Sequence, residues 1–98
     1  MFEVIVHVDV EDDLAKLDRR LQQQLLTVFR TRLTEAPSQY GKPLSGSLQG
    51  LRRVRMGDYR IAYQVTGKIV KVWAVRHRSE VYDVAVKRFQ KPLNPHDS

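Results

Sequence analysis

The chain has 98 residues, 17 Lys and Arg against 11 Asp and Glu, a net charge of +6 and no cysteine. This length predicts one domain with a modest core, and the lack of cysteine excludes disulfides and thiolate metal sites. The first ten residues hold Glu3 and Asp9 and no long apolar run, which argues against a signal peptide or a membrane span. We therefore expect one cytoplasmic domain over residues 1–90, a loose tail over residues 91–98, and no membrane partner.

The N-terminal third predicts a strand followed by two helices. Residues 2–8 are mostly aromatic or β-branched, which predicts a first strand buried on both faces. Asp9 is a candidate N-cap for a short helix, and Asp18 for a longer helix that Pro37 ends. Apolar residues recur at helical spacing in both: Val10, Leu14 and Leu17, then Leu21, Leu25, Val28, Phe29 and Leu33. We expect the two helices to form a hairpin over one face of a sheet.

The second half predicts three strands and a last helix, after the loop-rich residues 36–49. Residues 51–56 and 59–65 form a hairpin, because Gly57-Asp58 suits a type II′ turn. Residues 66–68 turn into an apolar strand, residues 69–75, which we expect inside the sheet. Ser79 is a candidate cap for a helix with Val81, Ala85 and Phe89 on one side. The order is β-α-α-β-β-β-α, an α+β fold whose αα-hairpin and C-terminal helix pack on a small antiparallel sheet.

The excess positive charge lies in the predicted strands. Residues 50–78 contain eight Lys and Arg and one Asp, a net charge of +7, so the rest of the chain is nearly neutral. Clustered cations attract nucleic acids, because binding releases counterions from the phosphates. Arginines on a sheet face can equally be solvated surface, and the charge alone does not separate binding from catalysis.

Strand geometry predicts that several of these cations meet. Arg53 and Arg55 alternate onto the same face of one strand. Further residues follow near the same end of the sheet: Arg60, Arg76, Arg78 and Tyr82. We therefore expect guanidiniums and one phenol to converge on a concave patch, where guanidiniums would bind a phosphate bidentately.

The other polar residues predict packing or solvation. His7 lies inside an apolar strand, where a packed histidine is more common than a ligand, and Trp73 is expected in the core. The acids Glu11, Asp12 and Asp13 are explained as charges at a helix N-terminus. Since the three histidines are far apart and no acid lies at ligand spacing, we expect no metal site and no cofactor.

Three motifs give the chain a family resemblance. They are GKPLSGSLQGLRR over residues 41–53, GDYRIAY over residues 57–63 and HRSEVY over residues 77–82. In this order they make the chain resemble toxins of the RelE/ParE superfamily, from toxin–antitoxin pairs, over residues 4 to 89. The resemblance implies the fold described above and a cognate antitoxin, a small acidic protein, as partner.

The resemblance leaves two activities. RelE-like toxins cleave mRNA in the ribosomal A site with basic sheet residues and a helix tyrosine, whereas ParE-like toxins poison DNA gyrase and lack the full set. The matching catalytic positions here are Arg53, Arg55, Arg60, Arg76 and Tyr82, and further RNA contacts are expected from Arg52, Lys71, His77 and Arg78. Many relatives carry glycine where this chain has Arg76. That replacement favours a metal-independent endoribonuclease whose partners are the ribosome and mRNA. A gyrase inhibitor and a non-catalytic RNA- or ribosome-binding protein are the alternatives.

The resemblance also implies a division of roles. Cleavage by the RNA 2′-hydroxyl needs a base, an acid and cations that hold the charge on phosphorus. Arg60 and Arg76 suit charge stabilisation, while Arg53 and Arg55 would grip the backbone. RelE-like enzymes often carry lysine at one or both of these last positions, and arginine cannot act as a base. Proton transfer is then left to Tyr82 or His77.

Overall fold

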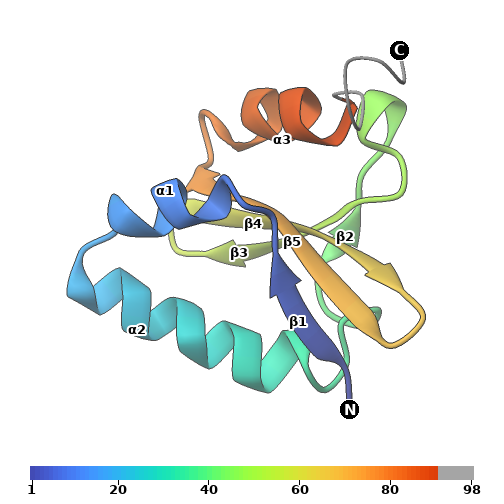
Figure 1. Cartoon of the computed structure of the whole chain (residues 1–98), viewed down its shortest axis with the longest axis horizontal. Coiled ribbons are helices and arrows are strands. Elements are labelled where there is room, and N and C mark those ends of the chain that lie inside the picture. The colour runs from blue at the N-terminus through green and yellow to red at the C-terminus, as the bar shows by residue number, and fades with distance from the viewer. Residues whose placement is uncertain (91–98) are drawn as a thin grey trace.

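The computed structural model describes residues 1–90, in which one five-stranded sheet lies between helices (Figure 1). The strands are β1 (Glu3–Val6), β2 (Lys42–Pro43), β3 (Arg52–Met56), β4 (Tyr59–Thr66) and β5 (Ile69–His77). The helices are α1 (Val10–Ala15), α2 (Arg19–Val28) and α3 (Val81–Gln90), with a π-helical turn at Phe29–Leu33 and a 3-10 turn at Gly46–Leu48. The expected α+β class and helix order are confirmed. The expected tail and His96 lie outside the described residues.

The sheet is mixed, so the expectation of a purely antiparallel sheet is wrong. The strand order is β1-β5-β4-β3-β2, and β1 runs parallel to β5 while the other pairs are antiparallel. The helical hairpin between β1 and the later strands provides the long crossover that a parallel pair requires. The short strand β2, unexpected from the loop-rich sequence, pairs with the start of β3.

The first strand is an exposed edge, so the prediction that it is buried on both faces is wrong. It pairs with β5 alone, and Ile5 and Val6 are 40% and 38% exposed. Only alternate residues such as Val4 pack against the core. A continuous apolar segment therefore forms an edge strand here. The composition of a segment does not reveal how many strands will pair with it.

Two apolar clusters lie on opposite faces of the sheet. The first joins α1 and α2 to Val54, Ile61 and Val72, which confirms that the helical hairpin covers one face. The second joins α3 to Ala62 and Ala74 on the other face. Figure 1 shows α2 and α3 on opposite sides of the sheet. Burial of both faces makes β4 and β5 the rigid centre of the protein.

A bulge in β5 changes which residues face α3. Tyr63 pairs with Val72 and Ala62 pairs with Ala74, so Trp73 has no partner on β4. Both Trp73 and Ala74 therefore pack with the α3 cluster. The bulge keeps Val75 in the first core while it puts Arg76 on the α3 face.

The two predicted hairpin turns are confirmed. Met56 pairs with Tyr59, and Gly57 between them has a φ of 62°. Gly67 has a φ of 60° in the turn between Thr66 and Ile69. Positive φ at the first corner residue is the requirement of a type II′ turn.

The helix caps follow the prediction in one case of three. The Asp18 carboxylate accepts a hydrogen bond from Leu21 N at 2.8 Å, as expected. Asp9 makes no side-chain cap bond; its N–H instead donates to Nδ1 of His7. The Ser79 hydroxyl lies 2.9 Å from Nδ1 of His77, in the turn before α3. Over residues 1–90, no helix has the length and apolar character needed to cross a membrane.

Candidate functional site

A row of three arginines crosses the centre of the sheet. Arg55 on β3 is the register partner of Arg60 on β4, which is in turn the partner of Arg76 on β5. Directly opposed residues project from the same sheet face. Because Arg53 pairs with Ala62, whose side chain packs under α3, all four arginines share the α3 face. These four predicted site residues thus share one sheet face, although Arg76 lines one cleft and Arg53 and Arg55 line another.

Tyr82 lies on the helix that covers this face. It is half-buried and packs against the α3 cluster, close to the start of α3. Arg55, at one end of the row, is exposed, whereas Arg76 at the other end and Arg53 beside the row are half-buried.

Arg60 is the most buried member, at 8% exposure. Its Nη1 donates to the carbonyl oxygens of Gly57 and Tyr59, at 2.8 and 2.9 Å. These bonds hold the β3–β4 turn and fix the guanidinium in the middle of the row. Arg60 is therefore part of the hairpin as well as of the cationic surface.

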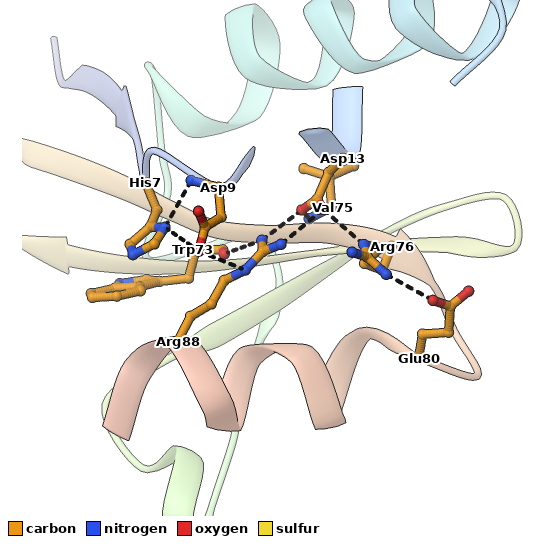
Figure 2. A network of polar contacts seen from close by, with 8 residues as sticks. All are labelled: His7, Asp9, Asp13, Trp73, Val75, Arg76, Glu80 and Arg88. Atoms are coloured by element: carbon orange, nitrogen blue, oxygen red, sulfur yellow. Dashed lines mark hydrogen bonds and ion pairs between the residues drawn. The ribbon is translucent and has the colours of Figure 1, made fainter. Parts of the chain in front are cut away.

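Arg76 is held by two carboxylates. Its Nε donates to Oδ1 of Asp13 at 2.7 Å, and its Nη1 donates to Oε1 of Glu80 at 2.8 Å (Figure 2). Asp13 is fully buried and also accepts from Val75 N and from both Nη atoms of Arg88. Asp13 does lie in the first turn of α1, as expected, but its burial and ion pairs give it a structural role beyond that of a charge at a helix N-terminus.

Charged donors stabilise the ionised form of Asp13. Burial alone raises the pKa of its carboxyl, but hydrogen bonds from Arg88, Arg76 and the Val75 N–H together bring the pKa below its usual 3.8. The bond to Asp13 likewise raises the pKa of Arg76. The Asp13 carboxylate and the Arg76 guanidinium therefore remain charged near neutral pH.

The sequence contained a signal for Asp13. Val10 and Leu17 mark the buried side of α1, and Asp13 falls between them at helical spacing. An acid on the apolar side of a helix predicts a buried, charged partner. Glu11 and Asp12 lie outside this apolar side, so Asp13 differs from its two acidic neighbours. Arg88 had no comparable signal, because its partner lies 75 residues away.

The four further residues that were expected to contact RNA do not lie on one surface. Arg52 lies opposite Tyr63 on the other face, and its Nη2 donates to the carbonyls of Ser38 and Gly41. His77 pairs with Tyr59 on that other face too, and its Nδ1 accepts from Ser79 N. Lys71 lies on the α3 face with Nζ 4.2 Å from the Trp73 ring centre. Arg78 is exposed at the end of β5.

Two clefts flank the row. An open cleft of about 710 Å³ lies between β5, α3 and the β1–α1 connection, and Arg76, Lys71 and Trp73 are among its lining residues. A second, of about 350 Å³, is lined by Arg53 and Arg55 at the β3 edge. His7 lines the first cleft and packs on Trp73, with ring centres 5.1 Å apart. Both side chains are half-buried. Among residues 1–90, no group of three His, Asp or Glu side chains could hold a metal ion.

Residues 4–82 match the family model described as ParE toxin of the type II toxin–antitoxin system parDE. The chain belongs to this toxin family. The match covers every motif that suggested the RelE/ParE superfamily, and that resemblance is confirmed.

Relatives of this RelE/ParE toxin include RelE proteins. It is 27% identical over 94 residues to a Mycobacterium tuberculosis protein named Toxin RelE, covering 96% of this chain and 90% of the relative. It also matches a chain of the RelBE2 toxin–antitoxin complex from M. tuberculosis, with 29% identity, a TM-score of 0.73, and coverage of 79% of this chain and 98% of the other. A chain of the archaeal RelE–RelB complex of Pyrococcus horikoshii shares the fold, with a TM-score of 0.58, 23% identity and coverage of 82% and 98%.

Proposed function

We propose that this toxin is a ribosome-dependent endoribonuclease that cleaves mRNA in the A site and so stops translation. The row Arg55–Arg60–Arg76 carries the proposal, because it lines up three permanent positive charges on adjacent strands. Like charges directly opposite one another destabilise a sheet pair, so such a row has a cost that a phosphate ligand would offset.

The chemistry needs positive charge where the phosphate gains negative charge. The RNA 2′-hydroxyl attacks its own phosphorus, and the P–O5′ bond breaks to leave a 2′,3′-cyclic phosphate and a 5′-hydroxyl. Arg60 and Arg76 would stabilise the pentacovalent phosphorane, since their guanidiniums are fixed before substrate arrives. The more exposed Arg53 and Arg55 would bind the RNA backbone.

Proton transfer is assigned to Tyr82. His77 was the other candidate, but its register places it on the opposite sheet face, where Nδ1 already accepts from Ser79. Tyr82 lies on the helix that packs on the same sheet face as the arginine row. A phenol can give or take a proton, whereas arginine remains protonated.

An antitoxin is the proposed protein partner. The matching RelBE2 chain from M. tuberculosis comes from a complex named as toxin with antitoxin. The exposed cations of this toxin predict an acidic segment in that partner, which would cover the arginine row and exclude RNA.

Inhibition of DNA gyrase is the second candidate. It is favoured by the description of the matching family model, which names the ParE toxin. A gyrase inhibitor would not need a tyrosine or a fixed phosphate clamp, so Tyr82→Phe would leave its toxicity intact.

A translation reaction with purified ribosomes and a defined message tests the proposal. Mapping of message 5′ ends should reveal new ends within the A-site codon only when the toxin is present. A supercoiling reaction with purified gyrase runs in parallel. Inhibited gyrase with an intact message would establish the second candidate and reject the first, and ribosome binding without cleavage would indicate a non-catalytic binder.

A further inference from the structure

The buried carboxylate of Asp13 occupies the place of a missing strand. Strand β1 pairs with β5 only as far as Val72, so the edge of β5 is open beyond that point. There the Val75 N–H donates to Oδ2 of Asp13 at 2.9 Å. Asp13 on α1 thus satisfies a backbone N–H at the open edge of β5, and it also bonds Arg76 and Arg88 on the α3 side of the sheet.

From this edge, Asp13 fixes one side of the Arg76 guanidinium. The Nε of Arg76 bonds Asp13 on α1, and its Nη1 bonds Glu80 in the turn before α3. Two anchors define the plane of the group, which a free arginine side chain would sample through many rotamers. Within residues 1–90 these bonds use Nε and Nη1, which leaves Nη2 to meet a phosphate oxygen.

Arg88 offsets the negative charge that Asp13 brings next to Arg76. Its Nη1 and Nη2 donate to Asp13 at 2.7 and 3.0 Å, and Nη1 also donates to the Trp73 carbonyl. Asp13, Arg76 and Arg88 together carry a net charge of +1, and Glu80, which also pairs with Arg76, brings the network to neutrality. Without Arg88, the two carboxylates of Asp13 and Glu80 would outweigh the single charge of Arg76. Figure 2 shows Asp13 between the two arginines.

We infer that Asp13 is a positioning residue that holds Arg76 in line with Arg55 and Arg60, and that Arg88 offsets the negative charge of Asp13. The inference rests on the proposed nuclease function. Through Asp13, helix α1 would contribute to the geometry of the proposed site, although α1 packs on the sheet face opposite the arginine row. This positioning role also explains why a charged network occupies a position that an apolar side chain could fill.

The matched pair of variants is Asp13→Asn and Asp12→Asn. Both remove one negative charge at nearly constant size, but Asp13 is buried and Asp12 exposed. On ribosomes programmed with a defined message, single-turnover cleavage is measured against toxin concentration and corrected for folded fraction. Asp13→Asn should lower the saturated rate by at least about tenfold, because small misplacements of a catalytic group are costly. The half-saturating concentration should change less than about threefold, and Asp12→Asn should change neither value.

A double-mutant cycle separates positioning from general destabilisation. If Asp13 acts through Arg76, Asp13→Asn should have no further effect on the rate in an Arg76→Ala background. Arg76→Lys, which keeps the charge and leaves Asp13 intact, should lose most of the rate, because an ammonium cannot bond both carboxylates and still present a fixed donor. Arg76→Lys keeps the test possible if Asp13→Asn does not fold.

A measurement without catalysis completes the test. In ¹⁵N NMR of the wild type, the Arg76 Nε–H should exchange slowly with solvent, and this protection should vanish in a folded Asp13→Asn variant. Rapid exchange in the wild type, or an Asp13→Asn variant that cleaves at the wild-type rate, overturns the positioning inference alone. A wild type that shows the protected Nε–H yet leaves the message intact overturns the nuclease proposal, and the positioning role falls with it.

Discussion

Arg55 and Arg60 face each other directly across β3 and β4, and Arg60 is buried while Arg55 is exposed. Two like charges in such a pair repel, and only Arg60 is bonded to nearby carbonyls. The sheet therefore tolerates an unfavourable pair at its proposed site, as expected where function and stability compete.

Removing this repulsion should raise stability while it lowers activity. We expect Arg55→Gln to increase the free energy of unfolding by up to about 0.5 kcal/mol at low salt, with a smaller gain at high salt. Cleavage on ribosomes should fall by at least about a hundredfold, as for loss of one oxyanion-stabilising donor. Urea denaturation and single-turnover cleavage measure the two effects. Arg30→Gln, an equal charge change on the exposed side of the helical hairpin, is the control and should keep full activity.

Asp13 should make stability depend on acid pH. Its pKa is depressed in the folded protein, so its contribution is fully present above the usual value of 3.8 and is lost as pH falls through the folded pKa. We expect the free energy of unfolding to drop below about pH 4. Urea titrations between pH 3 and pH 7 should show less of this drop for Asp13→Asn, and a wild-type drop for Asp12→Asn. Identical acid profiles for all three proteins would show that Asp13 is not paired as described.

Much of the fold follows from local sequence. Gly57 and Gly67 predict both tight turns, Asp18 predicts the start of α2, and strand alternation predicts that Arg53 and Arg55 share a face. These features depend on a few neighbouring residues, so propensity and periodicity determine them.

The features that the sequence did not reveal depend on distant pairing. The parallel alignment of β1 with β5 joins segments more than 60 residues apart, and nothing within residues 2–8 specifies that neighbour. The bulge at Trp73 and the contacts of Asp13 with Arg76 and Arg88 arise in the same way. Tertiary contacts also gave Arg52 and His77 structural neighbours that residue type alone did not predict.

Arg52 should support folding more than binding. Its bonds to Ser38 and Gly41 anchor the loop before β2, so Arg52→Ala should lower the free energy of unfolding by about 1–3 kcal/mol. Exposed Arg78 is the matched comparison, since Arg78→Ala should leave stability within about 0.5 kcal/mol. Ribosome binding as a function of salt should change more for Arg78→Ala. The reverse ranking would restore Arg52 to the RNA surface.

Gly41 should be far less replaceable than Gly46. Both have positive φ, 77° and 64°, but a Cβ on Gly41 would lie 2.5 Å from the Arg53 carbonyl oxygen and 2.6 Å from the Tyr63 hydroxyl. A Cβ on Gly46 meets nothing within 4 Å. Gly41→Ala should cost about 2–4 kcal/mol, from backbone strain plus overpacking, and Gly46→Ala about 1–2 kcal/mol. Equal losses in urea denaturation would mean that the loop moves aside.

The chemistry at the arginine row is tested most directly with a message that carries one 2′-deoxynucleotide before the scissile bond. On programmed ribosomes, the unmodified message should yield a 2′,3′-cyclic phosphate and a 5′-hydroxyl, and the 2′-deoxy message should remain intact at that position. Cleavage of the 2′-deoxy message at the same bond, or products with a 5′-phosphate, would contradict attack by the 2′-hydroxyl and the roles proposed for Arg60, Arg76 and Tyr82.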